Sequence, residues 1–302
     1  MEKVLVTGGS GYIGSNLLPA LEGEGYEIHS LQRSAREVSG TNIHIADVTD
    51  YVKTADIVHK VKPDSVIHLA ASGFNYAKKE TLDDLIRVNF TATMKLAEAC
   101  MALPEPPKFV YPTTYMECQG SEKPISADCQ LVPQSEYALS KSLSTNYLLY
   151  ATRAGLLDAT ILRLFSVYGK NDLKFRFIPS IFDAMMRGKS IETTSLSQKR
   201  DFVYIDDVVS AMLCAIRAKG SKATLYNVGS GKATRLLDVA ETIRGLFPDS
   251  KGKMMIGAKP DRPNEAPCYY ADIYETERAL SWKAKYGLKQ GLLETKKALG
   301  TQ

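Results

Sequence analysis

The sequence predicts an α/β fold, in which a doubly wound parallel sheet of the Rossmann type is joined to a smaller mixed α/β domain. Short apolar runs alternate with helical segments through the first half of the chain. The first run, Val4–Val6, leads directly into a glycine-rich turn that opens a helix. A later run, 66–71, is almost continuously apolar, as in strands that are buried on both faces. The alternation loosens beyond residue 168.

The individual elements follow from these patterns. We expect strands at 4–6, 27–31, 43–46, 66–71, 109–111 and 160–164, and helices at 13–21, 52–61, 85–103, 137–154 and 206–217. Residues 1–168 form the predicted dinucleotide-binding domain. Residues 169–302 form mainly the substrate domain, although segments near 200–230 are expected to return to the core.

Composition narrows the class of protein. The 302 residues are 44% hydrophobic and 24% charged, which is typical of globular proteins. The net charge of +4 is scattered, so it suits a small anionic ligand better than a nucleic acid. No apolar run is long enough to span a membrane. The five cysteines are odd in number and lack a C-x-x-C pair, so we expect reduced thiols, a cytoplasmic protein and no metal.

The glycine turn predicts a dinucleotide site. Gly8, Gly11 and Gly14 follow the first strand and open the first helix, with Tyr12 and Ile13 between the last two. Such glycines permit a tight turn, a close approach of pyrophosphate to the backbone and close packing of helix on strand. The helix N-terminus then offers free N–H groups to the phosphates.

The end of the second predicted strand bears on the choice of dinucleotide. NAD-binding proteins usually carry an acidic residue there, which accepts hydrogen bonds from the ribose. This chain instead has Gln32, Arg33 and Ser34, followed by Arg36. An arginine pairs with a 2′-phosphate, so the segment favours NADP(H) over NAD(H). The alternative is that Arg33 is a surface residue and Gln32 serves an NAD ribose.

A tyrosine and a lysine supply the candidate catalytic pair. Tyr137 and Lys141 lie four residues apart, on one face of a predicted helix. A nearby ammonium stabilises a phenolate and moves the tyrosine pKa toward neutrality. Thr114 follows the fifth predicted strand, at the edge of the sheet where ligands bind, and can donate to a substrate oxygen. Alone, the Tyr–Lys spacing is common on exposed helices.

Together these motifs make the chain similar to the extended short-chain dehydrogenase/reductases, within them the nucleotide-sugar epimerases, dehydratases and reductases. The resemblance rests on the 7–14 turn, the Thr114–Tyr137–Lys141 triad, and the segments 200–208, 226–231 and 261–265. It implies further cofactor contacts at Asp47, Val48, Leu69, Ala70, Ala71 and Asn89. It also implies a nucleotide-diphosphate sugar as substrate, with Arg200 and Arg262 on its phosphates.

Two departures from the family pattern affect the expected reaction. The 4,6-dehydratases usually carry Asp-Glu after the triad threonine, whereas Tyr115 and Met116 stand here, which disfavours a dehydratase. A shifted register would bring Glu117 or Cys118 into the site instead. Ser166 replaces a usual asparagine that faces the substrate, so its carried-over role is weaker.

The sequence therefore leaves two enzyme hypotheses. One is an NADPH-dependent reductase of a 4-keto, 6-deoxy nucleotide sugar, favoured by residues 32–34. The other is an NAD-dependent 4-epimerase. A non-catalytic NADP-binding regulator is a third hypothesis, disfavoured because the tyrosine and lysine are both present. By family analogy, helices 85–103 and 137–154 are expected to pair in a homodimer through a four-helix bundle.

Overall fold

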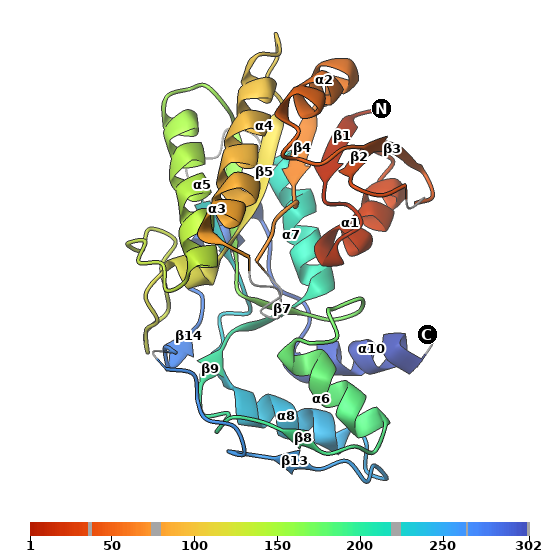
Figure 1. The fold of residues 1–302 in the computed structure, drawn as a ribbon, viewed down its shortest axis with the longest axis vertical. Helices are drawn as coiled ribbons and strands as arrows, with labels where there is room; N and C mark the ends of the chain where they lie inside the picture. The colour runs from red at the N-terminus through yellow and green to blue at the C-terminus, as the bar shows by residue number, and fades with distance from the viewer. Residues whose placement is uncertain (36–37, 74–79, 219–224, 264, 301–302) are drawn as a thin grey trace.

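The computed structural model describes residues 1–35, 38–73, 80–218, 225–263 and 265–300. A large unit built around one sheet stands above a smaller unit that contains α6, α8 and α10 (Figure 1). Seven strands make the large sheet, and every pairing is parallel. In spatial order they are β11 (Leu225–Val228), β6 (Ala159–Leu164), β5 (Lys108–Thr114), β4 (Ser65–His68), β1 (Lys3–Thr7), β2 (Glu27–Gln32) and β3 (Thr41–Ile45). The predicted fold class is confirmed.

The strand order creates a crevice at the middle of the sheet. The chain runs outward from β1 through β2 to β3, and then crosses back to place β4 on the other side of β1. The helices that follow β1 and β4 therefore leave in opposite directions, which opens a crevice at the carboxyl ends of these two strands. This is where the glycine turn begins.

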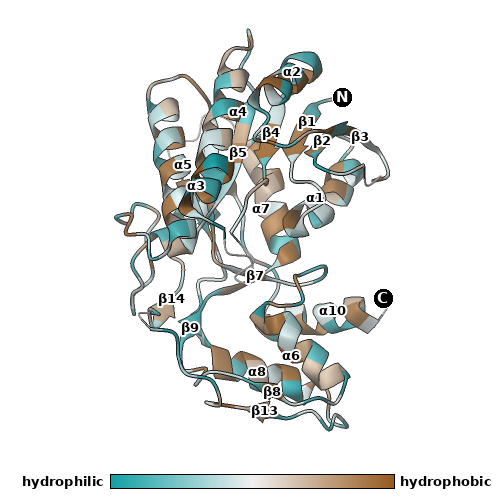
Figure 2. Cartoon of the chain, viewed as in Figure 1, coloured by the Kyte–Doolittle hydropathy of each residue, from teal (hydrophilic) through white to brown (hydrophobic). Residues whose placement is uncertain are grey.

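Helices cover both faces of the sheet because strand side chains alternate between the faces. Val4 and Val6 pack in one core with α1 (Tyr12–Gly23) and α7 (Ile205–Arg217). Leu5, between them, packs in the other with α2 (Tyr51–Val61), α4 (Ala92–Met101) and α5 (Glu136–Arg153). Figure 2 shows β4 in hydrophobic colours among helices of mixed character.

The predicted helix at 85–103 differs in its details. Helix α3 (Leu82–Leu85) begins three residues earlier, where Thr81 and Asp84 form a capping box. A π-helical segment, η1 (Ile86–Thr91), then connects it to α4. Two strand ends also differ: β4 ends at His68, and β5 continues through Thr114. The ends of a strand are set by its backbone hydrogen bonds to neighbouring strands, and the pattern of apolar residues predicts these ends poorly.

The smaller unit is assembled from short elements. Its helices are α6 (Phe177–Met186), α8 (Leu236–Gly245) and α10 (Leu288–Gly300). Its strands pair as β8 (Ile191–Glu192) with β13 (Met254–Met255), and as β12 (Thr234–Arg235), β9 (Lys199–Arg200) and β14 (Cys268–Tyr269). A parallel pair, β7 (Ser166–Tyr168) and β10 (Phe202–Tyr204), lies between the two units (Figure 1). Helix α9 (Tyr274–Leu280) follows β14 and contacts β11.

The expectation of five reduced thiols is wrong for two of them. Cys118 and Cys129 form a disulfide, whereas Cys100, Cys214 and Cys268 are free. The chain folds back between the bonded pair, and an antiparallel bridge from Cys118 to Leu131 brings the two segments together. Spacing alone did not reveal this contact because it depends on the path of the 115–135 loop.

No helix in the described part of the chain combines the length and the apolar character needed to cross a bilayer.

Candidate active site

The glycine turn is tightly packed against its surroundings. Gly8 has a φ of +71°, and a Cβ there would lie 2.7 Å from the backbone nitrogen of Ala70. A Cβ on Gly14 would lie 2.5 Å from the carbonyl oxygens of Gly8 and Gly9. Helix α1 starts after Gly11 without a side-chain cap, so its first N–H groups remain available to an anion. The turn therefore fits the pyrophosphate of a dinucleotide.

A buried chain of hydrogen bonds fixes the residues at the end of β4. The Thr7 hydroxyl accepts from the Ala70 N–H at 3.1 Å and contacts His68 Nδ1 at 2.6 Å. His68 Nε2 lies 2.9 Å from Thr93 Oγ1, whose hydroxyl donates to the Asn89 carbonyl oxygen at 2.6 Å. Burial lowers the pKa of His68 to about 3, so the ring is neutral near pH 7. One consistent arrangement has Thr7 donating to Nδ1 and Nε2–H donating to Thr93.

Asn89 joins this network to α5. Its side-chain amide donates to the Ser72 carbonyl at 3.0 Å and to Ser140 Oγ at 2.9 Å, and its Oδ1 accepts from the Ser72 N–H at 2.7 Å. Its carbonyl also accepts from Ser144. Asn89 lies in the π-helical segment, where widened pairing leaves backbone groups open to such partners. The network positions the helix that carries Tyr137 and Lys141.

The three candidate catalytic residues come from two neighbouring elements. Thr114 ends β5, is 8% exposed, and accepts the Met116 N–H at 3.2 Å, which leaves its hydroxyl hydrogen for another acceptor. Tyr137 is half-buried in the first turn of α5, where Ser135 caps the helix. Lys141 lies one turn further along and is 3% exposed.

Burial dominates the electrostatics of Lys141. Its Nζ lies 4.0 Å from the centre of the Tyr111 ring, a cation–π contact. Burial lowers the pKa of Lys141 to about 7, and the Glu117 carboxylate opposes that shift. The ammonium is therefore held in an environment in which it readily gives up or takes a proton near neutral pH.

The expected adenosine end of the cofactor site contains Arg33 and Asp47 in one cavity of about 350 Å³. Gln32 is buried: its Oε1 accepts from Ser30, and its Nε2 donates to the Ser34 carbonyl at 3.0 Å. Ser34 is exposed, and Arg36 lies outside the described residues. Asp47 accepts from the Thr49 N–H at 2.9 Å.

The remaining cofactor candidates lie along the same crevice. Leu69, Ala70 and Ala71 follow β4 and are half-buried, as is Val48 beside Asp47. Tyr12 and Ile13 open α1, and both are half-buried. The structure therefore brings these residues to the carboxyl ends of β1, β2 and β4.

Glu117 has a structural partner rather than an open position. It is fully buried, and Arg163 Nε donates to its Oε1 at 2.9 Å. The hydroxyls of Thr113 and Thr145 donate to its other oxygen at 2.8 and 3.0 Å. With Cys118 in a disulfide, neither of the two residues that a shifted register would bring into the site is free for acid–base work.

An aspartate that sequence reasoning left without a role holds two family signatures together. Asp201 follows Arg200 and is completely buried. Its carboxylate accepts from the N–H groups of Ser230, Gly231 and Ala271 at 2.7, 2.9 and 3.1 Å. A Cβ on Gly229 would lie 2.5 Å from it. The sequence did contain a signal for this role, because the 200–208 and 226–231 motifs occur together. The Asp201 carboxylate connects these two motifs by hydrogen bonds.

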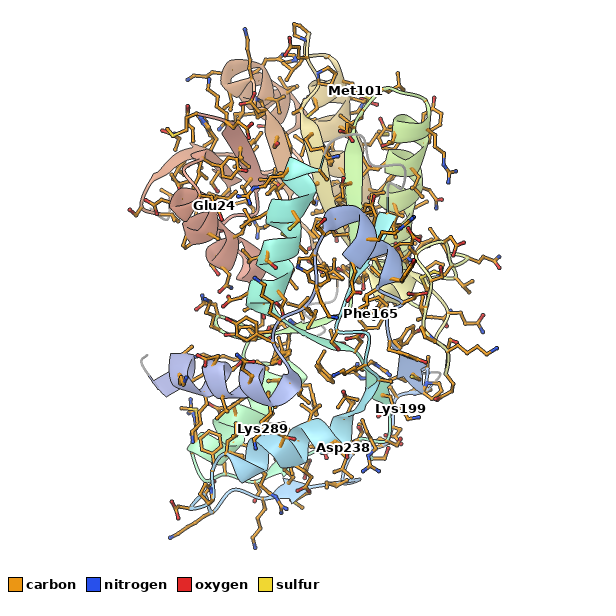
Figure 3. The ribbon with its side chains drawn as sticks, turned by 180° about the vertical axis from the view of Figure 1, so that it is seen from behind. Glu24, Met101, Phe165, Lys199, Asp238 and Lys289 are labelled. Carbon is orange, nitrogen blue, oxygen red and sulfur yellow. A yellow bond between two sulfur atoms is a disulfide. The ribbon has the colours of Figure 1, made fainter. Side chains whose placement is uncertain are left out.

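Arg200 and Arg262 lie in different surroundings. Arg200 is 6% exposed in β9, and its NH2 donates to Glu265 Oε1 at 2.7 Å. Arg262 is exposed in the loop that also carries Glu265. Ser166, half-buried at the start of β7, pairs through its N–H with the Asp201 carbonyl at 2.8 Å. The structure thus places Ser166 and Arg200 on adjacent elements between the two units, near labelled residues Phe165 and Lys199 in Figure 3.

Sequence reasoning also missed Arg176. Its guanidinium carbon lies 5.7 Å from the centre of the Tyr12 ring, and NH1 donates to Asp172 at 2.8 Å. Burial is the main cause that raises the pKa of Asp172, and Arg176 opposes it. Arg176 lies between Ser166 and the 200–208 segment, outside every motif found in the sequence, so no pattern marked it. It brings a cation from the smaller unit to the first residue of α1.

Metal ligands do not gather in the part of the chain that the structure describes: no group of three or more His, Cys, Asp or Glu side chains is placed to hold an ion.

Comparison with known proteins agrees with this geometry. Residues 4–229 match the model of the NAD dependent epimerase/dehydratase family. The chain belongs to this family. Proteins similar to it include CDP-abequose synthase of Salmonella muenchen, 29% identical over 304 residues that span 96% of each chain. The dTDP-4-dehydro-6-deoxyglucose reductase of Escherichia coli is 26% identical over 309 residues, 96% of this chain and 95% of that protein.

A solved structure supports the same assignment. The UDP-glucose 4-epimerase of Thermotoga maritima, determined with UDP-glucose, superposes with a TM-score of 0.88 and is 25% identical. The match covers 99% of each chain, so it includes the smaller unit as well as the sheet. The resemblance to the extended short-chain dehydrogenase/reductases is therefore confirmed as membership of the family.

Proposed function

We propose that the protein is an NADPH-dependent reductase of a nucleotide-activated 4-keto sugar, with a 6-deoxy sugar as the expected class. The placement of Tyr137 and Lys141 on α5 beside Thr114 at the end of β5 supports a hydride transfer, and the observation that favours NADPH as its donor is Arg33 in the cavity at the expected adenosine end. The similarity to a dTDP-4-dehydro-6-deoxyglucose reductase supports this choice of substrate class.

The residues divide the work in a simple way. A nicotinamide cofactor held at the glycine turn would supply the hydride for C4 of the sugar. Thr114 donates its free hydroxyl hydrogen to the C4 oxygen and stabilises the charge that develops there. Tyr137 delivers the proton to that oxygen, and the Lys141 ammonium favours the phenolate that remains. Because the pKa of Lys141 is about 7, this ammonium is sensitive to pH in the working range.

Binding is proposed to involve both units. The glycine turn, with Gly8, Gly11, Tyr12, Ile13 and Gly14, would hold the pyrophosphate, and Arg33 the 2′-phosphate. Arg200 and Arg262, with Ser166 nearby, would hold the diphosphate of the sugar nucleotide. On this proposal residues 1–168 bind the cofactor and 169–302 mainly bind the substrate. The homodimer and the cytoplasmic location stay predictions.

A 4-epimerase is the second candidate, supported by the likeness to the Thermotoga enzyme and by the family's NAD dependence. The same three residues serve both reactions, but an epimerase must take back the hydride that it removes. A net reductase releases oxidised cofactor instead. The two candidates therefore differ in how the cofactor is used.

The experiment that separates them is a fluorescence titration with NADPH and NADH, together with an assay for cofactor that co-purifies. Preference for exchangeable NADPH supports the reductase, whereas tightly retained NAD⁺ supports the epimerase. A Tyr137→Phe variant should lose about 10²–10⁴-fold in turnover and still bind cofactor. Undiminished turnover in this variant would overturn the catalytic assignment.

A further inference from the structure

A second arginine faces the cavity that contains Arg33. Arg33 follows β2, and Arg87 comes from η1, the π-helical segment after β4. The sequence separates them by more than fifty positions, but the crossing of the chain at β1 brings them to one cavity of about 350 Å³. Both guanidinium groups act on the Asp47 carboxylate, where they oppose the effect of burial on its pKa. The two cations therefore converge on the same small space.

Three carboxylates line the same cavity, and each already has a partner. Asp47 accepts from the N–H and hydroxyl of Thr49 at 2.9 and 2.8 Å. Glu80 accepts from the Ser72 hydroxyl. Asp84 accepts from Thr81 in the capping box and from Arg87 at 3.2 Å. Asp84 is therefore the carboxylate that a ligand of Arg87 would have to displace.

The Arg87–Asp84 pair is exposed enough to be exchanged. The side chains are 59% and 47% exposed, and such i,i+3 surface pairs contribute little free energy. A phosphate monoester carries between one and a half and two negative charges and accepts bidentate hydrogen bonds from guanidinium. It therefore competes well with one carboxylate for Arg87, and Asp84 retains Thr81 as a partner.

We propose that Arg87 is a specificity-determining residue that holds the adenosine 2′-phosphate of NADP(H) together with Arg33. The inference rests on the proposed use of NADPH and adds a residue to it. Asp84 keeps Arg87 in place when no phosphate is bound and competes with the phosphate when one is. The pair of arginines, one from each side of the chain crossing, distinguishes a 2′-phosphate from a 2′-hydroxyl.

The test measures binding of adenosine 2′,5′-bisphosphate and of ADP to the full chain by calorimetry. Arg87→Ala is expected to weaken the bisphosphate by about tenfold or more and leave ADP unchanged, because one charge-assisted contact is lost. Asp84→Asn is expected to tighten the bisphosphate, because the competing charge is removed. Arg278→Ala is the matched control, since Arg278 forms a similar exposed i,i+3 pair with Glu275.

Each other outcome has a definite meaning. If Arg87→Ala weakens the binding of the bisphosphate and of ADP equally, Arg87 contacts the adenosine 5′-phosphate that both ligands share, and the proposal is overturned. No weakening, with preference for the bisphosphate lost only in Arg33→Ala, would overturn it and leave the use of NADPH intact. If the unaltered protein binds the bisphosphate no better than ADP, the proposed use of NADPH fails first. Thermal unfolding of each variant excludes loss of fold as the cause.

Discussion

The guanidinium of Arg200 donates to the carboxylate of Glu265 across 2.7 Å, and the arginine side chain is only 8% exposed. Glu265 lies three residues after Arg262. The same loop therefore carries an exposed arginine, Arg262, and the carboxylate that binds Arg200. Arg200 also lies 5.2 Å from the centre of the Tyr269 ring. If Arg200 binds a substrate phosphate, that phosphate must displace Glu265 or share the guanidinium with it.

Glu265→Gln should therefore tighten the binding of nucleoside diphosphates. Removal of the competing charge should improve affinity by about five- to tenfold, the scale of one charge-assisted hydrogen bond. Calorimetry with UDP, CDP and dTDP would measure it. Glu122→Gln, which breaks the exposed pair with Lys199 beside Arg200, is the control. Weaker binding in Glu265→Gln would show instead that the carboxylate contacts the ligand.

Lys141→Met should abolish turnover and make the protein more stable at neutral pH. The pKa of Lys141 in the folded protein, about 7, lies below its value in the unfolded chain, so folding disfavours the charged form. The unfolded chain thus binds more protons between the two values, and wild-type stability rises with pH across that window. The stability advantage of the variant should shrink by about 2 kcal/mol from pH 7 to pH 9. Denaturant unfolding at both pH values would measure it, and a constant advantage would contradict the assignment.

Glu117→Gln should destabilise the fold strongly. The change leaves the fully buried Arg163 without its ionic partner, and breaking a buried pair costs about 3–5 kcal/mol. Glu24→Gln, which breaks the half-exposed pair with Arg217, should change the free energy of unfolding very little. Urea denaturation of the two variants gives the comparison. If both variants lose the same free energy of unfolding, the buried Glu117–Arg163 pair stabilises the fold no more than the half-exposed Glu24–Arg217 pair.

Loss of the Cys118–Cys129 disulfide should lower stability without removing the fold. The two cysteines are 11 residues apart in the sequence. Closing a loop of this length lowers the entropy of the unfolded chain and should stabilise the fold by about 3 kcal/mol. Cys129→Ser should therefore melt at a lower temperature than the oxidised protein, and added reductant should lower only the wild-type value. Identical melting with and without reductant would show that the bond does not form in solution.

Much of the large sheet was predictable because its signals are local. The run at Val4–Val6, the glycine turn and the apolar strand at 66–71 each follow from side-chain patterns within one element. The path of η1 was not predictable, since a π-helical segment preserves the apolar character of a helix and changes only its pairing. The extension of β5 through Thr114 likewise depends on β6, which pairs alongside it.

The candidate site also contains residues that local patterns predicted and residues that they did not. The Tyr137–Lys141 pair and the glycines were predicted from their spacing together with their positions after predicted strands. The partner of Arg200 could not, because Glu265, which accepts its hydrogen bond, lies 65 positions further along the chain. The hydrogen bonds of Asp201 and the approach of Arg87 to Arg33 both join segments that are distant in the chain. Such contacts cannot be predicted from the periodicity of the sequence, because each partner is a single polar residue.

The π-helical segment also limits how this region can change. A π turn contains one residue more than the α turn that it replaces, so removing a single residue there would turn it into ordinary helix. Everything N-terminal to the deletion, including Arg87, would then rotate by about 100° relative to Asn89 and α4. Arg87 and Val88 of this segment line the cavity that contains Arg33, and Asn89 binds Ser140 of α5. The length of this stretch therefore sets how Arg87 and Asn89 are oriented relative to each other, so an insertion or deletion of one residue should disturb both sets of contacts.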